Sequence, residues 1–197
     1  MVALVQDNQI AQDPRYGRYR LGMFVGLASV VMLFTGLSSA YIVRAASAPD
    51  WLALPLPRML WVGTGVLLIS SATLEAARRS LKRELDQNYR RWLGVTSLLG
   101  AAFLCSQLFV WRQLVRHGVY IATHPHSSFF YLLTATHGLH LAGGLLALLY
   151  LLVRHRSSPP DRPAKAKRLA TTEAITIYWH FMDALWIYLF LLLFLWR

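Results

Sequence analysis

The chain has 197 residues, of which 56% are hydrophobic and only 15% are charged. Soluble domains carry about 25% charged residues, and here the charges are gathered in short segments between long apolar runs. This pattern is typical of a multi-pass membrane protein and leaves little chain for a soluble domain.

Five stretches are long and apolar enough to cross a bilayer, which takes roughly 20 residues each. They predict an all-α fold, a polytopic transmembrane bundle of five spans at about 21–43, 58–78, 92–113, 128–153 and 174–196. The polar first 20 residues have no apolar core ahead of a small-residue cleavage site, so no cleavable signal peptide is expected. We therefore expect an N-terminal segment, 1–20, and a single transmembrane domain, 21–197.

Basic residues are distributed unequally over the predicted loops and ends. If the N-terminus is cytoplasmic, fifteen of the 20 Lys and Arg residues fall on the inner side. They are Arg15, Arg18, Arg20, Arg78, Arg79, Lys82, Arg83, Arg90, Arg91, Arg154, Arg156, Arg162, Lys165, Lys167 and Arg168. The positive-inside rule then predicts a cytoplasmic N-terminus and a periplasmic C-terminus. Orientation and attraction to anionic lipids account for the net charge of +11, so no nucleic acid partner is predicted.

The second and third predicted spans carry few groups capable of chemistry. Glu75 lies near the inner end of the second span, where pairing with Arg78 or Arg79 is expected. The third span contains Gln107 and the lone cysteine, Cys105. A single thiol forms neither an intramolecular disulfide nor a thiolate metal site, so we expect Cys105 to be a small buried apolar residue.

Histidines gather between the third and fourth spans. His124 and His126 flank Pro125, and His117 lies close by. A surface metal site is one interpretation and a solvated loop is the simpler one. The segment 154–168 after the fourth span has three prolines and a basic cluster, and it is predicted to be a flexible cytoplasmic link.

Polar side chains interrupt the last two predicted spans. His137 and His140 are three residues apart and so share a helix face, with Thr134 nearby, and His180 and Asp183 have the same spacing. An aspartate at the centre of a membrane helix costs about 2.5–3.5 kcal/mol. Polar groups facing lipid would be unsatisfied, so we expect these faces to turn toward each other or toward a partner protein.

Three interpretations of these groups differ in their chemistry. Metal or haem ligation is disfavoured, because only three histidines lie within spans and the Glu-x-x-His motifs of a di-iron bundle are missing. A proton relay through His180 and Asp183 is a second interpretation. The preferred one is an interhelix or intersubunit polar network that specifies how helices pack, at roughly 0.6 kcal/mol per hydrogen bond. Its predicted members are His137, His140, His180, Asp183, Thr134 and Gln107, and no metal ligand or catalytic residue is predicted.

Two motifs resemble a known family. The run "YWHFMDALWIYLFLL" is similar to the last helix, and "SSFFYLLTATHGLH" to the penultimate helix, of subunit III of the haem–copper terminal oxidases, cytochrome c oxidase in particular. The similarity extends from about residue 20 to the end and fits the five-span bacterial form.

The resemblance implies an accessory subunit without redox centres, seated on catalytic subunit I beside the other oxidase subunits. Haem and copper are then expected in those partner subunits of a proton-pumping enzyme that reduces oxygen to water. It further implies a place in the bacterial inner membrane, bound membrane phospholipid, and support of proton uptake and stability.

The resemblance also implies a role for one residue and shows two positions where the family's usual residue is replaced. Arg154 falls where the family has a basic residue that contacts a lipid phosphate, and an arginine can pair bidentately with phosphate. By contrast, Val30 and Val110 stand where the family often has glutamates, so no role of those carboxylates is expected here.

Two rival functions remain open from the sequence. The equivalent subunit of a ubiquinol oxidase or of a nitric oxide reductase would show the same features. An independent small transporter is a different class, disfavoured because the chain shows no inverted repeat and no matched pair of broken helices.

Overall fold

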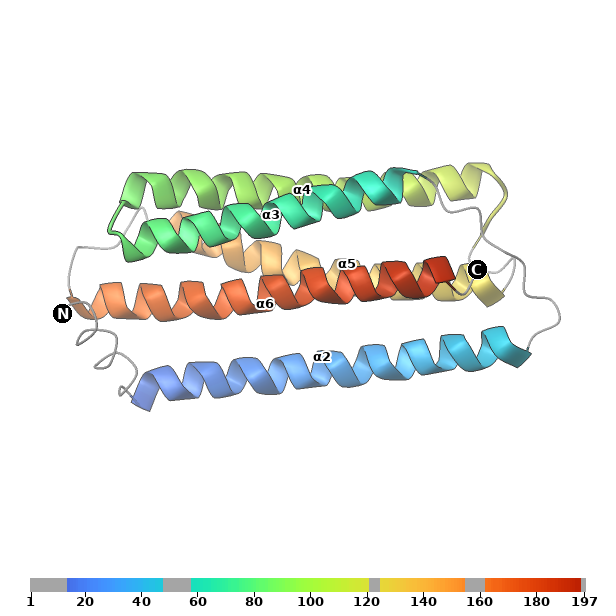
Figure 1. Ribbon diagram of the computed structural model, residues 1–197, viewed down its shortest axis with the longest axis horizontal. Coiled ribbons are helices and arrows are strands. Elements are labelled where there is room, and N and C mark those ends of the chain that lie inside the picture. The colour runs from blue at the N-terminus through green and yellow to red at the C-terminus, as the bar shows by residue number, and fades with distance from the viewer. Residues whose placement is uncertain (1–13, 48–57, 121–124, 155–161, 196–197) are drawn as a thin grey trace.

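The computed structural model describes residues 14–47, 58–120, 125–154 and 162–195. Within these ranges the chain forms five α-helices: α2 (Pro14–Ser47), α3 (Met59–Lys82), α4 (Asp86–Arg116), α5 (Pro125–Arg154) and α6 (Arg162–Leu195). Each contains a segment long and apolar enough to span a membrane. The predicted all-α bundle of five spans is therefore confirmed (Figure 1).

The helices extend beyond the predicted apolar spans. Most clearly, α6 begins at Arg162, so the second half of the expected link 154–168 is helical and that part of the prediction is wrong. The sequence Pro163–Arg168 explains the difference, because proline is tolerated in the first turn and alanine, lysine and arginine are good helix formers.

The helix α6 holds the central place in the bundle. It packs against α2, α3 and α5, while α3 and α4 form a hairpin and α4 also packs on α5. Figure 1 shows α6 between α2 and this hairpin. The hairpin turn, Arg83–Leu85, places Glu84 in the left-handed region at a φ of 59°.

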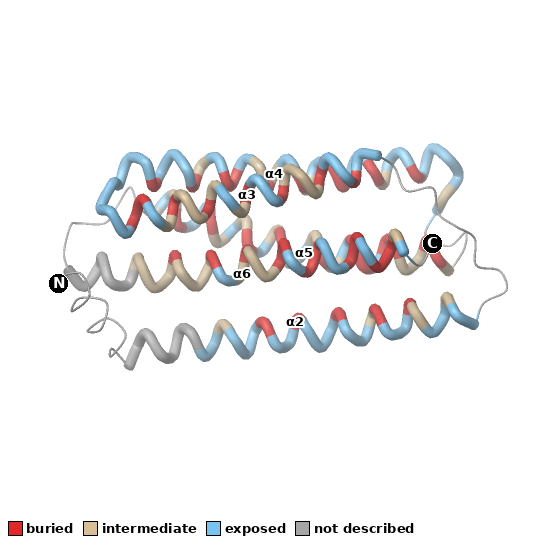
Figure 2. The backbone as a smooth tube through the Cα atoms, in the orientation of Figure 1, coloured by how far each residue is buried: buried red, intermediate tan, exposed pale blue. Residues whose placement is uncertain are grey.

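The outward surface of the bundle is apolar. Leu98 and Leu139, on α4 and α5, are 71% and 74% exposed, and exposed positions follow the outer faces of the helices in Figure 2. In water such a surface would mark an interface or a site of aggregation, whereas here it suits lipid chains.

Three side chains show how the interior and the exterior divide. Val30 and Val110, the positions where the resembling family often has glutamates, are buried in the hydrophobic core. Cys105 faces outward and is exposed, so the prediction that it is buried is wrong. The long apolar span gave no indication of which way its side chain turns.

The end of the bundle where α3 ends and α4 begins is rich in charge. We call it the basic end, and the basic residues whose side chains are described there are Arg78, Arg79, Lys82, Arg83, Arg90, Arg91 and Arg168. The expected pairing of Glu75 is confirmed, since its carboxylate accepts from Arg78 at 2.8 and 2.9 Å and from Arg79 at 2.9 Å. Glu173 on α6 pairs with Lys82 at 3.1 Å.

A second polar contact joins α4 and α6 at the basic end. Tyr89 is fully buried and its hydroxyl lies 3.0 Å from Thr172 Oγ1. The Arg168 guanidinium lies 5.4 Å from the centre of the Tyr89 ring and forms an ion pair with Asp86. These contacts hold the first turn of α4 against α6.

Candidate functional site: a polar interior in the helix bundle

Two tryptophans of α6 anchor that helix to α3. Trp179 donates its indole N–H to Ser70 Oγ at 3.0 Å, and Trp186 donates to Thr64 Oγ1 at 2.9 Å. The two rings are seven residues apart, two turns along one face, and both are almost completely buried. They fix the rotation of α6, and with it the direction in which the polar residues between them point.

His180 is joined to α3 by a short hydrogen bond. Its Nδ1 lies 2.5 Å from Ser71 Oγ. The imidazole is only partly buried, and it lines a cavity at the basic end. This residue thus connects an open space with the interior of the bundle.

Asp183 lies one turn further along α6 and points into the bundle. It is 4% exposed, and neither carboxylate oxygen has a hydrogen-bond partner among the described residues. The Ser71 hydroxyl on the facing helix makes its hydrogen bond to His180 and not to this carboxylate. A buried polar group without a partner is costly, so Asp183 is the most unusual group in the interior.

His137 and Gln107 share this property on the neighbouring helices. Both ring nitrogens of His137 and both amide atoms of Gln107 are buried without a partner in the described part of the chain. The His137 ring lies against Trp186, at 5.1 Å between ring centres, and meets the edge of Phe103 at 6.2 Å. Buried groups without a described partner thus occur on α4, α5 and α6 alike.

The two remaining predicted members of the network have ordinary partners. Thr134 accepts the Trp111 indole N–H at 3.2 Å and donates to the Phe130 carbonyl. His140 Nδ1 lies 2.8 Å from the Thr136 carbonyl, and its ring meets Phe34 of α2. Thr134 therefore links two helices by a hydrogen bond. The ring hydrogen bond of His140 stays within α5, but its carbonyl accepts the Tyr178 hydroxyl of α6 at 2.9 Å.

Sequence reasoning missed the α3 side of this site. Thr64, Ser70 and Ser71 supply the hydroxyls that hold α6, although the sequence showed only a span rich in small residues. It also missed His126, expected in a solvated loop or a surface metal site. His126 is 1% exposed and bonds the Tyr41 hydroxyl at 3.2 Å, so a solvated position is wrong for it.

The other two loop histidines and Arg154, the predicted lipid-binding residue, do not contribute described contacts to this site. His117 is exposed and bonds the Gln113 carbonyl, while His124 lies outside the described residues. Among the described residues, no group of three or more His, Cys, Asp or Glu side chains is placed to hold a metal ion. Arg154 is the last residue of α5, and its side chain lies outside the described part.

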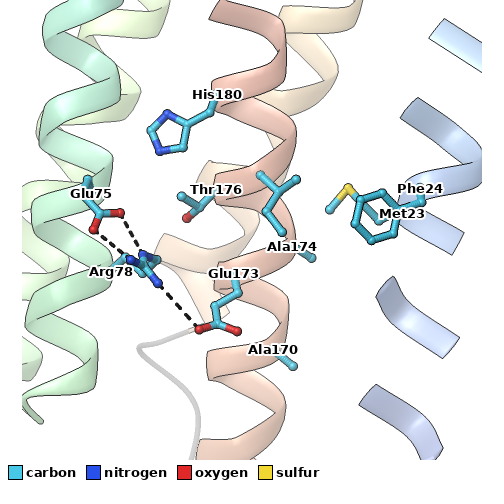
Figure 3. Close-up of a pocket in the computed structure, with 10 residues that line it drawn as sticks. Met23, Phe24, Glu75, Arg78, Ala170, Glu173, Ala174, Thr176 and His180 are labelled. Atoms are coloured by element: carbon cyan, nitrogen blue, oxygen red, sulfur yellow. Dashed lines mark hydrogen bonds and ion pairs between the residues drawn. The ribbon is translucent and has the colours of Figure 1, made fainter. Parts of the chain in front are cut away.

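A cavity of about 360 Å³ opens at the basic end between α2, α3 and α6. Met23 and Phe24 of α2 form its apolar side, and Glu75, Arg78 and Glu173 its charged side. Figure 3 shows Arg78 between the two carboxylates, with the His180 ring further along α6. The cavity is thus apolar on one wall and ionic on the other.

The amino-acid sequence of the chain is similar to those of several named proteins. The family model described as cytochrome c oxidase subunit III matches residues 14–197. A probable cytochrome c oxidase subunit 3 of Mycobacterium tuberculosis is 37% identical over 174 residues, 86% of this chain and 84% of that protein. The cytochrome c oxidase subunit 3 of Synechocystis is 30% identical over 178 residues, 88% of this chain and 74% of that protein. The protein of the same name from Bacillus sp. PS3 is 30% identical over 181 residues, covering 89% and 84%.

Proposed function

The chain belongs to the cytochrome c oxidase subunit III family, and from this premise we propose its part in a respiratory oxidase. As a family member it is an accessory, multi-pass membrane subunit that forms a complex with other oxidase subunits. We place it against catalytic subunit I of a proton-pumping oxidase that reduces oxygen to water. The observation that carries this proposal is the family match over residues 14–197. The names of the relatives favour cytochrome c oxidase over a ubiquinol oxidase or a nitric oxide reductase.

In this proposal the chain itself carries no haem or copper, which belong to partner subunits. The surroundings of its buried imidazole support this assignment. His137 is enclosed by the rings of Trp186 and Phe103, so its nitrogens have no open space for a porphyrin. The other histidines of the spans, His140 and His180, bond the Thr136 carbonyl and the Ser71 hydroxyl.

We assign the basic end to the cytoplasmic side of a bacterial inner membrane. The excess of Lys and Arg at that end supports the orientation through the positive-inside rule. Arg154 ends α5, and α5 follows α4 in the opposite direction, so Arg154 lies at the basic end as well. There its guanidinium would bind the phosphate of a phospholipid headgroup.

Gentle affinity purification of the full chain tests this function. We expect the tagged chain to bring down a catalytic subunit, and the preparation to show a haem spectrum. The same chain, stripped of its partners in stronger detergent, should contain no stoichiometric iron or copper. Purification of the chain alone from gently solubilised membranes that contain the oxidase would contradict the proposal, as would haem that stays on the stripped chain.

The lipid assignment is tested on the same purified complex. Replacing Arg154 with Gln removes the cation and should lower the amount of phospholipid that survives detergent washing. Arg116→Gln is the matched control, because Arg116 ends α4 at the opposite end of the bundle. Equal phospholipid retention in the two variants would show that Arg154 is an ordinary charged residue at the membrane surface.

A further inference from the structure

The cavity at the basic end reaches a polar residue of the bundle interior. Its charged wall comes from α3 and α6, and His180 forms part of its lining. In Figure 3 the His180 ring points from α6 toward α3, on the side of the cavity away from Ala170. The His180 imidazole therefore lines the cavity and also makes a hydrogen bond inside the bundle.

Beyond His180, the next polar side chain along α6 is that of Asp183. The imidazole bonds Ser71 at 2.5 Å, and Asp183 follows His180 by three residues on the same face of α6. Three groups from two helices thus form a series that runs from the cavity to the middle of the bundle.

The interior at the far end of this series needs additional partners. The carboxylate of Asp183, the imidazole of His137 and the amide of Gln107 are all buried and unpartnered among the described residues. Water molecules commonly satisfy such groups inside proteins, where each makes about three hydrogen bonds. Water needs an entry route, and the cavity lined by His180 supplies its outer part.

The opposite direction is closed by aromatic rings. Trp186 follows Asp183 by one turn, and its ring meets Phe103 at 5.0 Å between ring centres. Phe190, one turn further, is buried as well. These rings lie between Asp183 and the end of α6, so they separate the polar interior from the far end of the bundle.

The groups facing this route differ from helix to helix. Glu75 and Arg78 of α3 and Glu173 of α6 surround the entrance, and the α2 side chains described there, Met23 and Phe24, are apolar. Deeper in the bundle, His137 of α5 lies against Trp186, and the neutral Gln107 of α4 lies near Gly63 of α3. The charges are therefore concentrated at the entrance, and Asp183 is the acidic group that the route reaches.

We propose that the cavity, His180, Ser71 and Asp183 form a hydrated path that binds water and opens only at the basic end. Water molecules occupy the cavity and the space around Asp183, where they satisfy its carboxylate and the neighbouring polar groups. Asp183 then exchanges its proton with water of that side alone. A hydronium ion transfers its proton to the carboxylate and becomes water, and in the reverse step the carboxylic acid returns the proton to water. The proposal concerns this chain's own interior and does not depend on the oxidase function.

Thiol labelling of the full chain in sealed membrane vesicles tests this path. The background is Cys105→Ser, which removes the exposed native thiol. Ser71→Cys places a thiol of similar size on the path, and Ser97→Cys is the matched control. Ser71 and Ser97 lie eleven residues from Lys82 and Asp86, so both are about 16 Å along their helices from the basic end.

The probe is a small, permanently charged methanethiosulfonate, which does not cross lipid. We expect it to modify Ser71→Cys about tenfold or more faster than Ser97→Cys, because a thiol reacts only where water and reagent reach it. The reaction should occur only from the side on which Arg83→Cys, in the exposed turn, is modified. Ala174→Phe, which fills the cavity, should slow the modification of Ser71→Cys by a similar factor.

Several outcomes would overturn the proposal. One is that Ser71→Cys reacts no faster than Ser97→Cys. Another is that it reacts from both sides of the membrane, and a third is that Ala174→Phe leaves its reaction rate unchanged. If Ser71→Cys fails to accumulate in membranes, Asp183→Cys takes its place, with the same predictions and the same control. Loss of co-purification with a catalytic subunit would instead count against the proposed function and leave this labelling result unchanged.

Discussion

Replacing Trp186 with Ala should lower the free energy of unfolding of the full chain by about 3 kcal/mol. Large aromatic-to-alanine changes in soluble cores cost about 3–5 kcal/mol. In lipid the water-exclusion part of that cost is missing, because lipid chains are as apolar as the core. What remains is the lost packing on Phe103 and His137 and the lost hydrogen bond to Thr64.

The measurement is an SDS titration of the chain in mild detergent, followed by circular dichroism. Leu191→Ala is the matched control, because Leu191 lies on the same helix but is half exposed, and its removal should cost within about 0.5 kcal/mol. Trp186→Phe should fall between the two, since it keeps a ring and loses about 1 kcal/mol with the hydrogen bond. Equal midpoints for Trp186→Ala and Leu191→Ala would show that the packing of Trp186 on Phe103 and His137 does not stabilise the bundle.

Replacing Gly100 with Ala should destabilise the chain, although alanine favours helices more than glycine does. A methyl group on Gly100 would lie 2.7 Å from Trp179 Cη2 and 3.0 Å from Cζ2. The ring cannot retreat, because Gly144 of α5 lies against its other edge and its N–H is bonded to Ser70. Overpacking of this kind costs typically 1–3 kcal/mol, so we expect a net loss of about 1–2 kcal/mol.

Gly94→Ala on the same helix is the control with the opposite sign. No atom lies within 4 Å of the position where its methyl group would stand. Only the gain in helix propensity remains, so this variant should be more stable by up to about 1 kcal/mol. The same SDS titration measures both, and stabilisation by both substitutions would mean that Trp179 does not fill the space between α4 and α5.

The five spans could be predicted from the sequence because hydropathy alone selects segments that can cross a bilayer. The rotation of each helix could not, because a membrane helix is apolar on nearly all its faces. Cys105 illustrates this: its span was located correctly, but its side chain faces outward.

The sequence indicates which polar residues lie in the interior, but not which residues they contact. His180, Asp183 and His137 were singled out because polar groups in lipid are costly. Their surroundings depend on Ser71 of α3 and Trp186 of α6, which hydropathy does not bring together. His126 was misjudged for a related reason, since its burial depends on Tyr41 of the distant helix α2.

The place of α2 has a consequence for the order in which the protein is assembled. Its packing partners are α5 and α6 rather than α3, the next helix along the chain. During synthesis the α3–α4 hairpin can close as soon as α4 has been inserted, whereas α2 must wait in the bilayer until the last two helices emerge. Of the described helices, the one made earliest is therefore the last to be secured, and a chain that stops before α5 would leave α2 without its packing partners.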